Sequence, residues 1–228
     1  MKDKVQMIGK WQADAGFTLI EMIGVLAVIA ILVALLLPKV FEIMAESKAN
    51  SLVGAMRTYE TAIIDYYADI GSIRPLNVAG SPATELSGDS FVVRSLPARL
   101  TLDQSDPLNT GANSWSKFKG PYLSKISSDS PPGLGTKMYM PARGPVAYGT
   151  ATTASNRGWD FNNDGNSDIP TTASVVYVYF TGISNQDFEN VDVILDPGMG
   201  ATATERQLRG RVKYDTGTNE MMIYLTHQ

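Results

Sequence analysis

The sequence of 228 residues predicts an α+β fold, in which one long N-terminal α-helix packs on a small C-terminal antiparallel β-sheet. An uninterrupted apolar run at residues 17–37 opens the helix, and apolar residues spaced by three and four continue it to residue 70. Alternating branched and aromatic residues mark strands in the last third of the chain. The length makes one domain the default, with the helix preceding the sheet.

The apolar run is long enough to cross a membrane. Residues 17–37 contain one ionisable side chain, that of Glu21, and a helix needs about 20 apolar residues to span a bilayer. Residues 1–16 are polar and carry three lysines against two aspartates, which favours a cytoplasmic N-terminus. We therefore expect a polar leader at residues 1–16 and a transmembrane half-helix at residues 17–38.

Glu21 is the unusual residue of this run, because a carboxylate at the centre of a bilayer costs about 2.5 to 3.5 kcal/mol on insertion scales. A small-residue site, Ala15-Gly16, precedes the apolar run, so cleavage there would leave the hydrophobic helix on the mature chain. Phe17 would then carry a new positive amine, which a neighbouring copy shifted along the helix axis would bring to Glu21. The alternative is a simple anchor whose glutamate lies at the level of the lipid headgroups.

The string GFTLIE at residues 16–21, followed by an apolar run that ends at Pro38, resembles the class III signal of type IV prepilins and type II secretion pseudopilins. The close resemblance covers about a quarter of the chain. It implies that prepilin peptidase cuts after Gly16 and methylates Phe17, and that Glu21 guides assembly into a helical filament. Pro38 matches a helix-kinking proline of the family, and the implied fold is type IV pilin-like.

Residues 39–71 continue as an amphipathic half-helix that lies outside the membrane. Small and apolar residues recur there at alternating steps of four and three, at Ala45, Ala49, Leu52, Met56, Tyr59, Ile63, Tyr66 and Ile70. Such a stripe fits either a coiled-coil dimer seam or packing on the chain's own sheet, and two tyrosines among small residues favour the sheet. Gly71 and Pro75 then end the helix.

Residues 72–135 are rich in Gly, Pro, Ser and Asn without sustained periodicity, which predicts a long connecting region with short local elements. In pilins the segment between helix and sheet is long, variable and surface-forming. The string GPYLSKI at residues 120–126 resembles one seen at this place in major pseudopilins.

Residues 136–228 make up the predicted β-sheet domain. The strand signals lie at residues 137–140, at residues 174–182 and at residues 210–226, where two strands are joined by a glycine-containing turn. Residues 186–195 fit a short helix or a strand equally well.

The string DFNNDGNSDIPT at residues 160–171 follows the spacing of an EF-hand calcium loop. Its first, third, fifth, seventh and ninth places are held by Asp160, Asn162, Asp164, Asn166 and Asp168, with the seventh offering a backbone carbonyl. Gly165 supplies the sharp turn, but Thr171 replaces the bidentate glutamate and no helices flank the loop. We therefore expect a looser calcium-binding loop, which also agrees with the calcium stabilisation of major pseudopilins as a class. The alternative is a turn enriched in Asn, Asp and Gly.

Other functions are excluded or disfavoured by composition. A net charge of −4 argues against nucleic-acid binding, and the absence of cysteine excludes disulfides and thiolate sites. The single histidine, His227, lies next to the last residue, which disfavours a catalytic triad or a histidine metal site. The acidic residues between 187 and 196 suggest a solvated stretch, and Trp115 and Trp159 suggest core or subunit contacts. We expect no enzyme.

The sequence as a whole predicts a structural subunit of a type IV pilus-like or type II secretion pseudopilus filament. Its expected partners are prepilin peptidase, an inner-membrane assembly platform and other pilin-like subunits. The expected location is the bacterial inner membrane, with one span and a periplasmic C-terminal domain, before incorporation into a periplasmic or extracellular filament. The alternative is a single-pass anchored binding protein that never polymerises.

Overall fold

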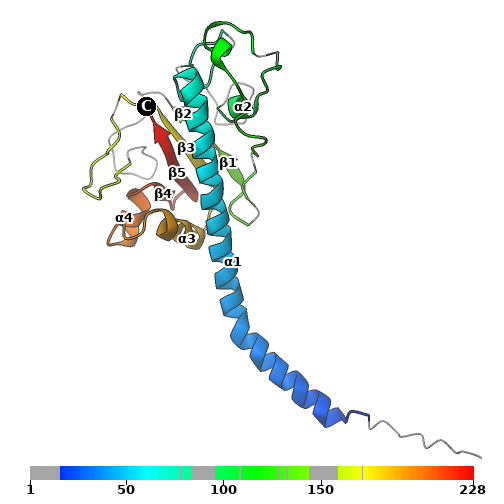
Figure 1. Cartoon of the computed structure of the whole chain (residues 1–228). Coiled ribbons are helices and arrows are strands. Elements are labelled where there is room, and N and C mark those ends of the chain that lie inside the picture. The colour runs from blue at the N-terminus through cyan, green and yellow to red at the C-terminus, as the bar shows by residue number, and fades with distance from the viewer. Residues whose placement is uncertain are drawn as a thin grey trace, which may run out of the picture. The chain divides into compact units, whose positions relative to one another are not determined.

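The computed structural model confirms the α+β class (Figure 1). It describes residues 16–77, 79–83, 96–107, 109–127, 129–131, 133–143, 159–170 and 172–228. The chain divides into two units, Met1–Met44 and Ala45–Gln228, which are considered separately below. The predicted leader, up to Ala15, lies outside the described residues.

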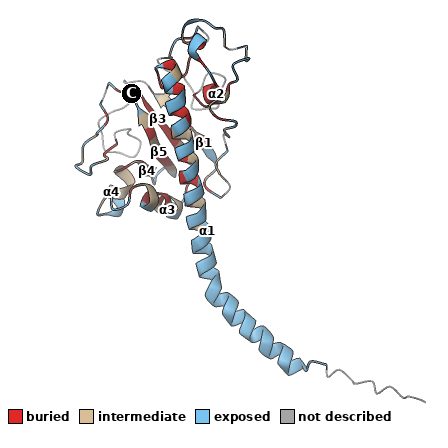
Figure 2. Cartoon of the chain, viewed as in Figure 1, coloured by how far each residue is buried: buried red, intermediate tan, exposed pale blue. Residues whose placement is uncertain are grey.

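Helix α1 runs from Leu19 to Ile70, two residues shorter at its start than the sequence predicted. Thr18 precedes the first helical residue and caps it, so the helix cannot extend back to Phe17. In the first unit every residue from 16 to 44 is exposed (Figure 2). Pro38 lies inside the helix, where it has no backbone N–H to donate to the carbonyl four residues earlier.

In the second unit, one face of α1 is buried against the sheet. The buried residues are Ala49, Leu52, Val53, Met56, Ala62, Ile63, Tyr66 and Ile70. Most of this face belongs to the predicted stripe, and these side chains share one core with strand residues such as Val178 and Ile223. The sheet, rather than a coiled-coil partner, therefore covers this stripe.

The sheet is antiparallel, with the strand order β1-β3-β5-β4 and a short fifth strand, β2, also paired with β3. The strands are β1 (Lys137–Tyr139), β2 (Ala142–Arg143), β3 (Val175–Thr181), β4 (Val212–Asp215) and β5 (Glu220–His227). Each predicted strand range contains one or two of these strands, with ends that differ by at most two residues. Among the described residues, the two-residue β2 is the strand that was not predicted.

The pairing of β3 with β5 contains one register shift. Val176 pairs with Thr226 but Tyr177 pairs with Tyr224, so β5 holds one extra residue at this point.

The face of the sheet toward α1 carries the main core. The opposite face carries a smaller core of Trp159, Ile169, Ala173, Val175, Tyr177 and Met222. Trp159 is fully buried there, and Trp115 lies in the main core, as predicted.

Two helices pack beside β4 (Figure 1). Helix α3 (Asn185–Leu195) resolves the ambiguity of residues 186–195, because the Ser184 side chain caps its first turn and Phe188 stacks on Tyr214. Helix α4 (Ala203–Leu208) was not predicted. It is short and begins with a capping box between Thr202 and Glu205.

The described part of the connecting region contains helix α2 (Leu96–Thr101) and the 3₁₀ helix η1 (Asn113–Lys117). This region is tied to the end of α1 by side-chain hydrogen bonds. The Asp69 carboxylate accepts from Lys119 Nζ at 2.6 Å and from the Tyr122 hydroxyl at 2.9 Å. The Tyr66 hydroxyl accepts from the Leu76 amide at 3.1 Å, which closes the turn after the helix.

Truncation of the α1 face should show how much the second unit depends on it. Ile63 is fully buried, so Ile63→Ala should lower the free energy of unfolding by about 2 to 5 kcal/mol through lost apolar burial and a residual cavity. Urea denaturation of the detergent-solubilised chain, followed by tryptophan fluorescence, measures the change. Ile64→Ala is the matched control, because Ile64 is 59% exposed and its truncation should cost far less. Equal losses for both variants would contradict the packing described here.

Candidate functional site

The first candidate site is the segment that leads into α1. Gly16, Phe17 and Thr18 lie outside the helix, and the Phe17 side chain is 83% exposed. The predicted scissile bond, between Gly16 and Phe17, therefore precedes the first helical residue. A peptide bond outside a helix is free of the intrahelical hydrogen bonds that would hold it away from a peptidase.

Thr18 and Glu21 form a reciprocal capping box at the start of α1. The Thr18 amide and hydroxyl donate to Glu21 Oε2 at 2.8 and 2.7 Å, and the Glu21 amide donates to Thr18 Oγ1 at 3.3 Å. The T-x-x-E string is the sequence signature of such a box. Thr18 was not predicted as the partner of Glu21, although this signature is sufficient to find it.

The capping box has two consequences for the carboxylate. It satisfies backbone donors that have no partner within the helix, and it places negative charge at the positive end of the helix dipole. Both hydrogen bonds from Thr18 reach the same oxygen, Oε2, and the described residues supply no donor to Oε1. Glu21 therefore keeps one carboxylate oxygen for another partner.

The surface around Glu21 is apolar. Most of the large apolar side chains between Phe17 and Met44 are about half exposed or more, for example Leu19 at 77% and Leu35 at 72%. Within the described residues, α1 is the helix long and apolar enough to cross a membrane, judged by length and composition, and its apolar window is not buried inside the protein. After Pro38 the polar surface begins with the ion pair between Lys39 and Glu42, at 2.8 Å.

Residues 11–37 match the family model for the prokaryotic N-terminal methylation motif. Neither a curated protein nor a solved structure gives a significant match to the chain. The matched motif is the class III signal of type IV pilins and pseudopilins, as the sequence analysis predicted. It indicates a type IV pilin-like precursor that is processed by prepilin peptidase, and such proteins are structural rather than enzymatic. The individual roles of Gly16, Phe17, Glu21 and Pro38 stay predictions.

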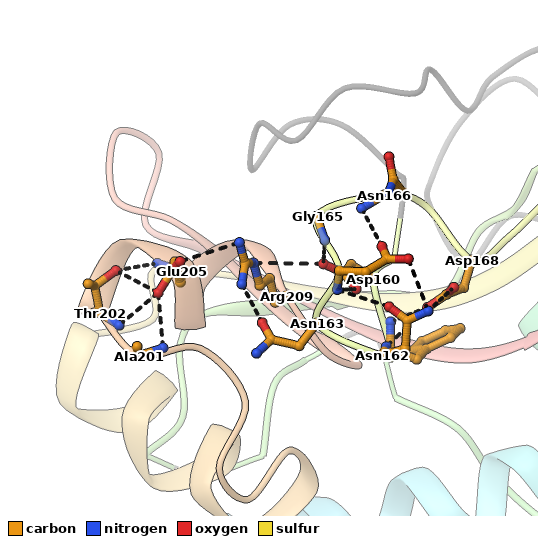
Figure 3. A network of polar contacts seen from close by, with 12 residues as sticks. Asp160, Asn162, Asn163, Gly165, Asn166, Asp168, Ala201, Thr202, Glu205 and Arg209 are labelled. Carbon is orange, nitrogen blue, oxygen red and sulfur yellow. Dashed lines mark hydrogen bonds and ion pairs between the residues drawn. The ribbon is translucent and has the colours of Figure 1, made fainter.

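The second candidate site is the Asp/Asn loop that follows Trp159 (Figure 3). Asp160 Oδ1 accepts from the Asp164 amide at 3.1 Å, and its Oδ2 accepts from the Gly165 amide at 2.7 Å. Gly165 has a φ of +88°, the left-handed conformation expected of the glycine at the sixth place. The first half of the loop therefore folds around the Asp160 side chain.

The other predicted ligands are engaged within the same loop. Asp168 Oδ2 accepts from the amides of Phe161 and Asn162 at 2.6 and 3.1 Å, and Asn162 Nδ2 donates to Asp168 Oδ1 at 3.0 Å. Asp164 Oδ1 accepts from the Asn166 amide at 2.8 Å, which lowers the pKa of Asp164. Thr171, at the twelfth place, lies outside the described residues.

The positively charged side chain of Arg209 lies beside the loop. Arg209 Nε lies 3.7 Å from Asp160 Oδ2, and the same guanidinium contacts Glu205 at 3.3 Å and the Asn163 side chain (Figure 3). On β4, the fully buried Lys213 lies 5.4 Å from the centre of the Trp159 ring. Burial lowers the pKa of Lys213 to about 8, and the Asp160 carboxylate opposes this shift.

These contacts bear on whether the loop fits calcium. Each carboxylate oxygen has two lone pairs, so the backbone N–H bonds leave acceptor capacity for a cation. In the part of the chain that the structure describes, however, no three His, Cys, Asp or Glu side chains are grouped closely enough to hold a metal ion. Calcium binding would therefore require the loop to draw its three aspartates together, and the calcium loop stays a proposal. No local sequence signal indicates the position of Arg209, because this residue lies more than forty residues further along the chain.

Thermal unfolding of the detergent-solubilised chain with and without calcium tests this proposal. At calcium concentrations about 100 times the Kd, binding should stabilise the fold by about 2.7 kcal/mol, or roughly 5 to 10 °C in Tm. Asp164→Asn should remove most of this shift. Asp103→Asn is the matched control, because Asp103 is also exposed and also accepts an amide two residues ahead, at 2.8 Å. Equal Tm values in calcium and in chelator would leave a turn held together by its own hydrogen bonds.

Proposed function

We propose that this chain is a structural subunit of a type IV pilus-like or type II secretion pseudopilus filament. Prepilin peptidase cleaves the precursor after Gly16 and methylates Phe17, and an inner-membrane assembly platform then adds the subunit to the filament. The observation that carries this proposal is the Glu21 carboxylate, which has a donor on only one oxygen among the described residues. It lies in an otherwise apolar and exposed segment, residues 17–37, within the methylation motif.

The exposed apolar surface of α1 needs a partner both before and after assembly. In the precursor this partner is the lipid of the membrane, which matches a run of about 20 apolar residues. In the filament it is the same surface of neighbouring subunits, because apolar helices that leave lipid must still be covered. The first unit of the chain thus forms the filament core, and the sheet unit forms the filament surface.

Cleavage supplies the missing partner of Glu21. It creates a positive amine on Phe17, four residues before the carboxylate, and a copy shifted along the axis presents its own amine to Glu21. In the monomer, Thr18 occupies Oε2 and leaves Oε1 for this contact. An opposite charge in apolar surroundings is worth far more than in water, so the pair would fix the axial position of each subunit.

Pro38 has a mechanical role in this proposal. It leaves the carbonyl of Ala34 without its usual backbone donor, which weakens the helix locally at the end of the membrane-spanning half. A local bend at this point lets neighbouring helices pack closely in a filament. The polar leader, with its surplus of lysines, sets the cytoplasmic end, so the sheet unit is periplasmic in the precursor.

A single-pass anchored binding protein is the second candidate, and one observation favours it. The sheet unit has a cavity of about 500 Å³ beside β5, lined by both apolar and charged side chains that include Glu60, Arg211, Tyr224 and Phe161. Glu60 and Arg211 form an ion pair within it. A cavity of this size is adequate for a small ligand, although mere display of a ligand site requires no carboxylate at position 21.

The intact mass of the protein extracted from its native membrane tests processing. The proposal expects a chain that begins at Phe17 and carries one additional methyl group. Cells lacking prepilin peptidase provide the control and should contain only the uncut chain. An uncut chain in cells with an active peptidase would favour the anchored binding protein.

Replacement of Glu21 tests assembly separately from processing. Glu21→Ala should insert into the membrane but lower the yield of sheared or cross-linked filaments at least tenfold, because the amine of the neighbouring subunit loses its partner. Glu42→Ala is the matched control, since it also removes one carboxylate from α1 but breaks only the exposed pair with Lys39. Normal filaments from Glu21→Ala would rule out the pairing.

A further inference from the structure

Two carboxylates are buried one helical turn apart at the end of α3. Asp192 is 2% exposed and Asp196, the residue that ends the helix, is 5% exposed. Both lie in the acidic stretch between residues 187 and 196, and the prediction that this stretch is solvated is wrong for this pair. The reason is that the helix turns Phe188, Val191 and Asp192 toward the core.

Asp196 connects the end of α3 to the start of β4. Its Oδ2 accepts from the Val212 amide at 2.7 Å. The carboxylate also lies against Gly210, where an added Cβ atom would come within 2.4 Å of it. Gly210 has a φ of +81°, so both its conformation and the space beside it require glycine. The junction between helix and strand is therefore built around the Asp196 side chain.

Asp192 has no comparable set of donors. Its Oδ1 is buried and receives no hydrogen bond from the described residues. A buried carboxylate that lacks donors is costly when ionised, and the cost increases when a second carboxylate lies nearby. Protonation removes this charge and turns Asp192 into a hydrogen-bond donor.

We propose that the junction of α3 and β4 is a proton-controlled latch, closed when Asp192 is protonated and loosened when Asp192 ionises beside Asp196. This inference goes beyond the proposed filament function and does not depend on it. Release of the latch would free the end of α3 and the segment that leads to β4. Asp196, Met199 and Arg211 also line the cavity beside β5, so the latch controls one wall of that cavity.

Burial and the charged groups around Asp192 and Asp196 determine how stability changes with pH. The pKa of Asp192 is raised to about 7, first by desolvation and then by the charges of Asp196 and Glu189, while the Arg206 charge on α4 opposes the rise. Desolvation also raises the pKa of Asp196, while backbone hydrogen bonds from Arg211 and Val212 and the Arg211 charge lower it. Between the ordinary carboxyl pKa and about 7, the folded chain holds a proton that the unfolded chain has lost. Stability should therefore fall as the pH rises through this window and level off above it.

The test compares Asp192→Asn with wild type in the detergent-solubilised full chain. Between pH 5.5 and pH 8.5, the Asp192 contribution should lower the Tm of wild type by roughly 4 to 8 °C. Asp192→Asn keeps the shape but cannot ionise, so it should lack this contribution and unfold at a higher temperature than wild type at pH 8.5. Glu189→Gln is the matched control, because it removes from the same helix the carboxylate that contributes least to the pKa of Asp192. It should keep most of the pH dependence of wild type, moved slightly to lower pH.

Amide hydrogen exchange tests whether ionisation of Asp192 loosens the junction of α3 and β4. At pH 8.5, protection of the Val212 amide should be about tenfold or more higher in Asp192→Asn than in wild type, and equal in the two proteins at pH 5.5. The proposal is overturned if Asp192→Asn follows the pH dependence of wild type, or if it is less stable than wild type at pH 8.5. It is equally overturned if the Val212 amide shows no difference between the two proteins at pH 8.5.

Discussion

Apolar side chains run along the whole of α1, and among the described residues the chain buries them from Ala49 onward. In the Ala45–Gln228 unit the sheet supplies the cover, through one core that includes Leu52, Ile63 and Tyr66. In the preceding unit the described residues supply none. This imbalance is the constraint behind the rest of the structure, because the uncovered half requires lipid or other helices, whereas the covered half holds the sheet unit together.

The helix and the strands could be predicted because their signals are local. The spacing of apolar residues identified the face of α1 that packs on the sheet, and alternation identified β3 and the β4–β5 hairpin. Contacts between distant parts of the chain gave no such signal. The position of Arg209 beside Asp160 depends on how α4 and β4 return to the loop, and the burial of Asp192 depends on which side of α3 meets β4.

The candidate site divides in the same way. The start of α1 is marked by a local sequence motif. The six residues 16–21 contain both the core of the methylation signal and the capping residue Thr18. The Asp/Asn loop was recognised by the spacing of its Asp and Asn residues along the sequence. That spacing does not specify which groups their side chains bind. There the aspartates accept hydrogen bonds from the backbone of their own loop, and an arginine from elsewhere in the chain lies beside them.

In the proposed filament, tension along α1 would reach the hydrogen bonds at the C-terminal end of this helix. Asp69 binds Lys119 and Tyr122, while the hydroxyl of Tyr66, one turn earlier, closes the turn that follows the helix. Tension along α1 would load these contacts together with the packed face of the helix, so they share the force instead of breaking one after another. The sheet unit would then resist extension as one body, which is what the proposed filament subunit requires.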